Sequence, residues 1–540
     1  MSISHIFNGK VISLPGAYSA VKAGSTNYYS TSSYSKVLII NTDKENSFGG
    51  AVNGELTKGK DALYRVRTQA EAKSLLKAGR LYQMVKPLFQ PSRKSGTNGI
   101  SDLYYINALT TKAAVMKPEL TSGDAELSIQ CLDEGLSGNG NETSKGSGVL
   151  ATGYALKIIS GVRDTSKYII QIWQGTFKGL AEDGYPYDEV AIEDSVPELV
   201  FESAEVESVG KFVEWAQGNP TFNNGFRIKS WKDGQFQEAD KSHNTLVLAK
   251  DGTATYAETD LEAALEYLQD LDFNVLFSLN MTGEDGADTI NTRFQYFIQN
   301  EVRGEKFLAI AGKNDLVTGG FTENQEEAAR CNSDRIWLIH GIPRKNSTFV
   351  PAGYRTLTPL YLTALLVGRQ VGLPPQDSLT FKDVDIDGLE FPLKYNQKED
   401  ALSAGLLTVA YDEDLEIFSC IRGVNTLQNN DYIQNADGSS PLIQLTRIAA
   451  QLNTDICINA KRRFFTTEAG PNRSSISTQY LEDWVRGQLE NKVATENRDN
   501  IIISYSDVSV TRKGDAYYVT YKFEPNNEIG FLFFTGFSII

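Results

Sequence analysis

The chain has 540 residues, of which 41% are hydrophobic and 22% are charged, and its formal net charge is −16. This length suggests three or four domains with sizeable hydrophobic cores. The acidic balance argues against a nucleic-acid-binding protein, because no surplus of Lys and Arg is available to neutralise phosphates.

The cysteines and the first residues indicate the compartment of synthesis. Four cysteines lie far apart in the sequence and form no CxxC pair, so we expect buried free thiols of a reducing compartment at Cys131, Cys331, Cys420 and Cys457. The N-terminus lacks the features of a signal peptide, and the apolar runs are too short to span a bilayer. These features predict a soluble protein made inside the cell, without membrane insertion.

Before residue 123 the sequence predicts an extended arm, two strands and one helix. The arm covers residues 2–14 and ends at the turn Pro15-Gly16. Apolar and β-branched content predicts strands at residues 37–41 (VLIIN) and 104–108. A helix is expected at residues 68–78, with Gly79 placed to stop it. From about residue 123 to 260, short alternating runs between Gly, Ser and Asp turns predict a mostly β unit.

Helices and strands alternate after residue 260. Amphipathic helices are expected at residues 261–271, 289–302 and 322–331, and apolar strands at 274–279, 307–311 and 335–340. Strands separated by helices in this way imply parallel βαβ units. A further apolar helix is expected at residues 358–371.

The C-terminal part has its own plan. Apolar stripes predict a long helix from Leu445 to Ile456 and a second helix at 476–492, which carries Leu481, Val485 and Leu489 on one face. Strands are expected at residues 501–505 and 508–511, followed by a hairpin turn at 513–515 and two aromatic terminal strands.

The last strand, residues 529–540, is apolar on both faces. Successive side chains of a strand point to opposite sides, and both sides here are hydrophobic: Ile529, Phe531, Phe533, Phe537 and Ile539 on one, Leu532, Phe534 and Ile540 on the other. Such a strand at an open edge would promote aggregation. It is either buried in its own domain or donated to the sheet of a second copy of the chain.

Motifs for catalysis or cofactor binding are missing or incomplete. No GxGxxG follows the three strands, and no GxxxxGK[ST] occurs. The run Asp383, Asp385, Asp387-Gly388 resembles the start of an EF-hand loop, but its twelfth position is Lys394 rather than Glu. The three histidines, His5, His243 and His340, form no metal or nucleophile motif. We therefore expect neither an enzyme nor a cofactor or metal site, although nucleotide or calcium binding stays open as an alternative.

Several segments, in the right order over nearly the whole chain, resemble the contractile tail sheath proteins of bacteriophages and related injection machines. The opening VISLPGAY, the strand VLIIN and the segment LSIQCLDEGLSGN are similar to that family's first blocks. Later blocks are similar at residues 363–389, which include the Asp-rich run, at residues 399–405 and at the segment RGVNT (422–426). The end, YKFEPNNEIGFLFFTGFSII, looks like the family's closing strands.

The resemblance implies a structural subunit that forms stacked hexameric rings around a tail tube and contracts to drive the tube through a cell envelope. Its implied partners are further copies of itself, the tail tube protein, and the baseplate and tail terminator proteins. It would be assembled in the host cytoplasm and belong to the virion. The alternatives are the sheath of a headless contractile injection system, or an αβ ligand-binding protein or enzyme that uses residues 261–340.

The expected architecture is a mixed α+β fold of several domains with an αβ core of parallel βαβ units. We expect an N-terminal linker arm (residues 1–20) and a middle αβ domain in two segments (21–120 and 255–372). Between these segments we expect an inserted mostly β domain (121–254), of the kind that often projects outward in this family. A C-terminal αβ sheath core domain (373–524) and a C-terminal linker strand (525–540) follow.

Two sets of residues are the candidate functional sites. The expected subunit-linking side chains are Ile3, Ile6, Phe7, Val11 and Ile12 of the N-terminal arm and the eight apolar residues of the last strand named above. On the helix at 476–492, charged side chains away from the apolar stripe are expected to face the tube or, equally, to be a solvated helix face: Glu482, Asp483, Arg486 and Glu490.

Overall fold

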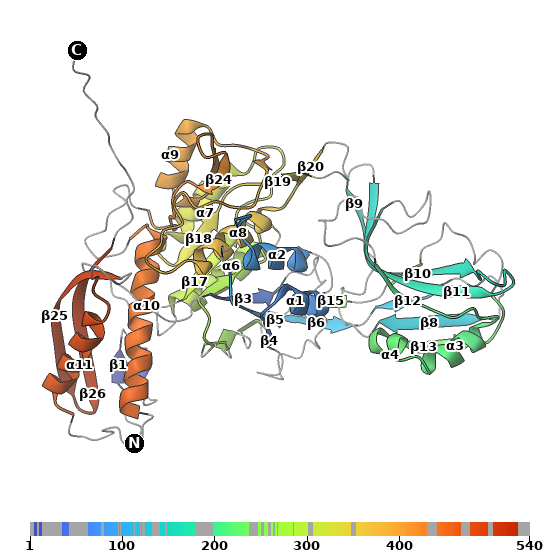
Figure 1. The fold of residues 1–540 in the computed structure, drawn as a ribbon, viewed down its shortest axis with the longest axis horizontal. Helices are drawn as coiled ribbons and strands as arrows, with labels where there is room; N and C mark the ends of the chain where they lie inside the picture. The colour runs from blue at the N-terminus through green and yellow to red at the C-terminus, as the bar shows by residue number, and fades with distance from the viewer. Residues whose placement is uncertain are drawn as a thin grey trace, which may run out of the picture.

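The structure is a computed structural model of the chain. With short gaps it describes residues 5–7, 10–12, 35–42, 63–120, 125–131, 141–178, 198–236, 247–256, 261–346, 353–428, 440–465, 476–494 and 501–526. A seven-stranded sheet lies near the middle, a β-rich part at one end, and two helices with a long hairpin at the other (Figure 1).

The central sheet is mostly parallel. Its strand order is β22 (Leu406–Leu407), β18 (Ile336–Ile339), β17 (Phe307–Ala311), β16 (Val275–Phe277), β3 (Lys36–Asn41), β5 (Asp102–Asn107) and β4 (Tyr64–Val66). Every neighbouring pair is parallel except β4 with β5. The predicted parallel pairing of the three strands after residue 260 is confirmed, and VLIIN is the strand next to them.

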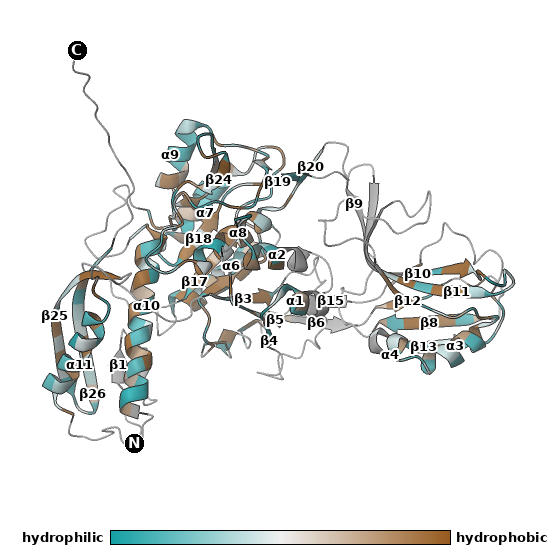
Figure 2. Ribbon diagram, viewed as in Figure 1, coloured by the Kyte–Doolittle hydropathy of each residue, from teal (hydrophilic) through white to brown (hydrophobic). Residues whose placement is uncertain are grey.

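The sheet is buried on both faces, which explains its continuous apolar strands. Alternate residues of each strand enter two different cores: Val37, Phe277 and Ile339 pack on one face, and Leu38, Leu276 and Leu338 on the other. The central strands are accordingly hydrophobic throughout their length (Figure 2).

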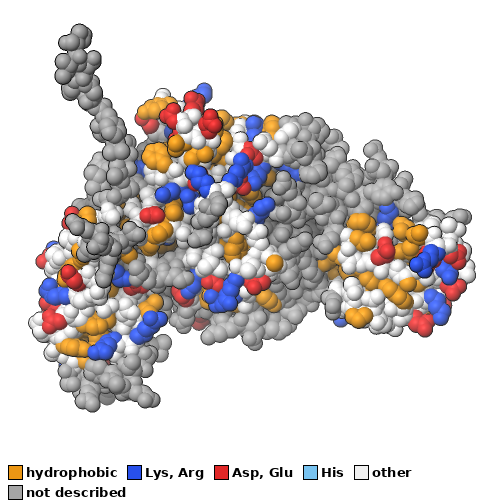
Figure 3. Space-filling model, viewed as in Figure 1, with side chains coloured by type: hydrophobic (Ala, Val, Ile, Leu, Met, Phe, Trp, Pro, Cys, Tyr) orange, Lys and Arg blue, Asp and Glu red, His pale blue; other side chains and the backbone are white. Residues whose placement is uncertain are grey.

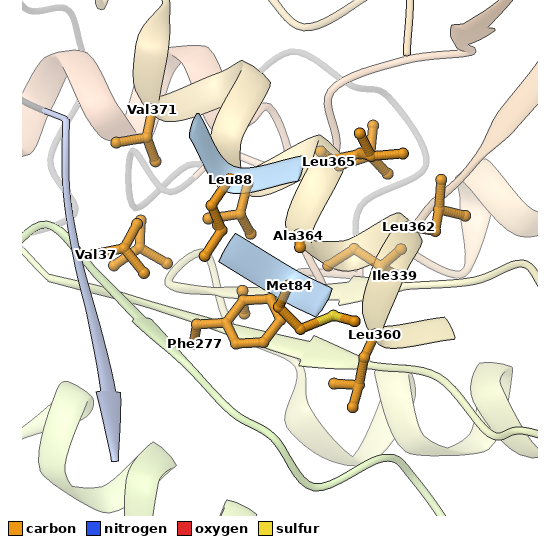
Figure 4. Packing of buried hydrophobic residues seen from close by; sticks show 14 of the residues in the cluster. Val37, Met84, Leu88, Phe277, Ile339, Leu360, Leu362, Ala364, Leu365 and Val371 are labelled. Atoms are coloured by element: carbon orange, nitrogen blue, oxygen red, sulfur yellow. The ribbon is translucent and has the colours of Figure 1, made fainter. Parts of the chain in front are cut away.

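Helices α2 (Arg80–Phe89) and α8 (Pro359–Gly372) cover one face of the sheet (Figure 4). Gly368 lets these helices approach closely, because a Cβ at this position would lie 2.5 Å from the carbonyl oxygen of Leu88. The other face is covered by α6 (Ala287–Gln299), α7 (Phe321–Cys331) and the predicted helix after residue 260, whose Leu261 and Leu268 are buried.

Residues 115–248 contribute two antiparallel sheets with a core of their own. The first has the order β12 (Glu198–Glu202), β11 (Tyr168–Lys178), β10 (Gly148–Ser160), β14 (Val247–Leu248), with β9 (Asn141–Lys145) also on β10; the second has the order β13 (Phe226–Lys232), β8 (Glu126–Cys131), β7 (Val115–Met116). Aromatic rings join them to α3 (Val209–Gln217) and α4 (Pro220–Gly225): Phe222 lies 5.0 Å from Phe201 and 5.8 Å from Phe226 between ring centroids. The mostly β content agrees with the prediction, but α3 and α4 were not predicted.

Short elements connect these parts. They are α1 (Gln69–Leu76), α9 (Tyr395–Ser403), the pair β6 (Leu109–Lys112) and β15 (Thr253–Tyr256), the sheet β20 (Tyr354–Thr356), β19 (Pro343–Asn346), β21 (Gly388–Leu389), and the hairpin β23 (Val409–Asp412), β24 (Ile417–Cys420). Of the four free cysteines, Cys457 is half-buried and the other three are buried. None of the helices in the described part of the chain has the length and apolar character needed to cross a membrane.

The C-terminal part consists of two helices and a hairpin. Helices α10 (Ile443–Ala460) and α11 (Thr478–Glu490) share a core with β25 (Ile502–Lys513) and β26 (Ala516–Pro525). The prediction of two strands at 501–505 and 508–511 is wrong: β25 is one strand with a register irregularity between Ser506 and Ser509. Asp507 lies there with a φ of 50°, so the interruption expected between residues 505 and 508 is an irregularity within one strand and not a strand end.

Candidate functional site

The carboxyl edge of the parallel sheet is the place where such folds usually bind ligands. Among the described residues, the polar side chains at this edge form hydrogen bonds with one another. After β16, the Ser278 hydroxyl donates to Asn291 Oδ1 at 2.7 Å, and Asn280 Nδ2 donates to Thr42 Oγ1 at 2.9 Å. All four residues are buried.

The neighbouring strand ends are joined in the same way through Asn324 of α7. Its Oδ1 accepts from the backbone N–H of Lys313 at 2.8 Å, so its Nδ2 donates to His340 Nδ1 at 2.9 Å. Lys313 Nζ, the cation after β17, lies 2.8 Å from Glu323 Oε1, and this pairing raises the pKa of Lys313 and lowers that of Glu323. Lys313 is therefore already paired with a carboxylate of its own subunit.

The aspartates of residues 383–387 bind basic side chains. Arg93 contacts Asp385 and Asp387, and Lys345 Nζ donates to Asp385 at 2.8 Å. The basic partners of the whole segment are Arg93, Lys94, Lys345 and Arg369. Burial raises the pKa of Asp385, but Lys345 and Arg93 outweigh burial and hold the pKa below its ordinary value. The aspartates of this segment form an ion-pair network that connects the residues after α2 with the strands at 343–346 and 388–389.

The sequence left calcium binding open as an alternative for these aspartates. Across the described ranges, no group of three or more His, Cys, Asp or Glu is placed to hold a metal ion.

Helix α11 presents its charges in two different ways. Ser477 caps its N-terminus by accepting from the Tyr480 N–H at 3.1 Å. Leu481, Val485 and Leu489 are buried, as their spacing predicts. Asp483 is exposed and accepts a hydrogen bond from Gln479, one turn earlier, at 3.0 Å.

The other three predicted tube-facing residues have partners within the subunit. Glu482 and Arg486 form an ion pair at 2.8 Å, and Arg486 also donates to the Val508 carbonyl at 3.2 Å. Glu490 accepts from the Tyr505 hydroxyl at 2.9 Å. These contacts attach α11 to β25, whereas Asp483 is exposed and, among the described residues, bonds to its own helix. Figure 3 shows acidic and basic side chains interspersed over this part of the molecule.

The N-terminal arm contains a β-hairpin rather than a single extended segment. Strands β1 (His5–Phe7) and β2 (Lys10–Ile12) pair antiparallel, with Ile6 opposite Val11. The two residues between them, Asn8-Gly9, are a pair that favours two-residue hairpin turns, a signal that the sequence reading missed. Phe7 and Ile12 belong to the same strands, whereas Ile3 lies outside the described residues.

The C-terminal linker residues also lie outside the described part, which ends at 526; they are Ile529, Phe531, Leu532, Phe533, Phe534, Phe537, Ile539 and Ile540. The chain leaves β26 beside α10, where Gln444 Nε2 donates to the Asn526 carbonyl at 3.3 Å. Among the described strands, β25 and β26 pair only with each other, apart from one isolated bridge between Ile502 and Val493. The outer side of β25 is partly engaged within the subunit, because the Ile502 N–H donates to the Lys492 carbonyl at 2.9 Å and Arg486 donates to the Val508 carbonyl at 3.2 Å.

Comparisons with known proteins agree with the sequence reading at the level of the fold. No family model and no curated protein matches the sequence. The crystal structure of the sheath tail protein from Desulfitobacterium hafniense is similar over 94% of this chain and 97% of that chain, with a TM-score of 0.55 and 12% identity.

Two further structures are similar at lower scores. The sheath tail protein from Listeria innocua gives a TM-score of 0.45 at 12% identity, over 93% of this chain and 96% of that chain. The contracted helical sheath of the anti-feeding prophage gives a TM-score of 0.41 at 10% identity, over 98% and 99%. The Desulfitobacterium match shows that the chain has a fold similar to that of a sheath tail protein along almost its whole length. The resemblance inferred from the sequence is confirmed at this level.

Proposed function

We propose that the chain is a structural subunit of a contractile sheath. The observation that carries this proposal is the fold similarity to a sheath tail protein over 94% of the chain. The subunit polymerises as stacked hexameric rings around a tail tube, and contraction of the lattice drives the tube through a cell envelope. It works without catalysis or cofactor, within a virion or within a headless injection system.

The proposed partners follow from this role. Further copies of the chain form the lattice, the tube lies inside it, and baseplate and terminator proteins close its ends. The proposed domains are those expected from the sequence: the two-segment αβ domain, the β domain inserted at 121–254, and the C-terminal sheath domain up to residue 524. The separate hydrophobic core of residues 115–248 supports the inserted domain.

The termini are proposed to be lattice linkers. The apolar strand at 529–540 would add to a sheet edge of a neighbouring copy. The β25–β26 pair supports this proposal, because among the described strands it is a two-stranded sheet, and such a sheet can be extended by a further strand. The exposed side of α11 that carries Asp483 is proposed to face the tube.

Electron microscopy of the purified full chain tests the proposal directly. We expect regular tubes in negative stain, with sixfold symmetry in end views. Calorimetry on the same sample should give no heat of binding with ATP, GTP, NAD or Ca2+ at micromolar concentrations, because the carboxyl edge of the sheet is occupied by its own side chains. A monodisperse chain that forms no tubes and binds one of these ligands tightly would instead favour the ligand-binding alternative.

A further inference from the structure

A cavity of about 20 Å3 lies between the central sheet and helix α10. Val275, Phe307 and Trp337, from the beginnings of β16, β17 and β18, form one side. Arg447 and Gln451 of α10 lie on the other side. The cavity is therefore at the amino edge of the sheet, opposite the edge described above. Its volume suits one water molecule or one ion of similar size.

Two residues that line the cavity, one on each side, have a buried N–H group without a hydrogen-bond partner among the described residues: Nη1 of Arg447 and Nε1 of Trp337. Arg447 is 6% exposed and Trp337 is 0% exposed. The second terminal nitrogen of Arg447, Nη2, donates to the Leu373 carbonyl at 3.0 Å, which fixes the guanidinium in place but does not neutralise it. Buried donors normally have partners, and an acceptor in the cavity would supply one for these two groups.

The charge of Asp377 acts on Arg447, but Asp377 neither forms an ion pair with it nor lines the cavity. None of the described residues that line the cavity is Asp or Glu, and Arg447 takes part in no ion pair among the described residues. Burial lowers the pKa of Arg447 to about 10, partly opposed by the charge of Asp377. The side chain is therefore still a cation at neutral pH, and buried cations are usually paired with an anion.

We propose that this cavity binds a small monovalent anion of the size of chloride, between the Arg447 guanidinium and the Trp337 indole N–H. The bound anion joins α10 to the amino edge of the central sheet. Water would satisfy the two donors but would leave the charge of Arg447 without an anion beside it.

Thermal unfolding of the full chain in chloride tests the site. Chloride is raised from 10 to 100 mM while isethionate, a larger anion, holds the ionic strength constant. An anion that binds only the folded state raises the unfolding midpoint by about 1 °C over this tenfold range. Trp337→Phe keeps a ring against Phe307, 5.3 Å away, but removes the N–H, so the chloride response should be lost.

Two further variants separate the site from general salt effects. Arg447→Met should also lose the response, and Arg227→Met, which removes an exposed guanidinium bound to Gln130, should keep it. Crystals soaked in bromide should show an anomalous peak between residues 337 and 447. An unchanged chloride response in Trp337→Phe, or density for water alone in the bromide crystals, would overturn the proposal.

Discussion

His340 is a single residue whose protonation is set by the fold. It is 2% exposed at the end of β18, and burial lowers its pKa to about 4, whereas an unfolded chain has a histidine pKa near 6.5. Its ring accepts a hydrogen bond from Asn324, which needs the neutral form. The unfolded chain therefore binds more protons than the folded chain between these two pKa values, and the free energy of unfolding must fall as the pH falls through this range.

We expect His340 to contribute a loss of about 3 kcal/mol in unfolding free energy between pH 7.5 and pH 4. Urea denaturation at several pH values measures this loss. His340→Gln cannot titrate but keeps an acceptor for Asn324, so its stability should depend less on pH by that amount. Equal pH slopes in the two proteins would show that His340 is not buried as a neutral ring.

At the scale of the element, α11 carries charged side chains with two kinds of partner. Glu482, Arg486 and Glu490 contact one another or β25, whereas Asp483 bonds only to its own helix. Asp483→Lys should therefore leave the folded subunit intact, with stability changed by about 0.5 kcal/mol or less, as for other surface substitutions. If this face meets the tube, assembly on the tube should fall about tenfold or more, since a like charge at an interface is costly.

A co-sedimentation assay of sheath with tube measures this effect, with thermal unfolding as the check on folding. Glu413→Lys, an equal charge change at an exposed residue beyond β23, is the matched control and should assemble normally. Normal assembly of Asp483→Lys would remove α11 from the proposed tube contact.

The proposed role of the two terminal segments leads to a prediction about the whole molecule. Residues 527–540 follow β26, and the N-terminal hairpin precedes Pro15. A chain that ends at Asn526 keeps the whole β25–β26 pairing and the contact with Gln444. We expect this chain, and a chain that starts at Pro15, to unfold at temperatures within a few degrees of the full protein.

Both truncated chains should fail to form tubes, because a donated strand is needed for the lattice and not for the subunit. Electron microscopy and calorimetric unfolding of the same samples separate the two effects. Regular tubes from either truncation would exclude that terminus as a linker. An aggregated or molten chain after truncation at Asn526 would mean that the last strand belongs to its own core.

The sequence alone determined the elements whose pattern is local. The apolar runs at 274–279, 307–311 and 335–340 with helices between them determined a parallel sheet, and the spacing of Leu481, Val485 and Leu489 determined the buried face of α11. Helix α2 was missed because Pro87 in its last turns lowers helix propensity, while its contact with α8 compensates. The order of sequence blocks was also enough to identify a sheath-like fold.

Only the tertiary structure decided which distant residues meet. Arg93 lies on Asp385 and Asp387, and Trp337 lies across a cavity from Arg447, because packing of the sheet against its helices brings together segments about a hundred or more residues apart. The continuity of β25 through Asp507 and the engagement of Glu482, Arg486 and Glu490 with their own subunit were decided in the same way. The periodicity of a sequence indicates which face of a helix or strand a residue occupies. The residues that it contacts on that face are set by the three-dimensional packing.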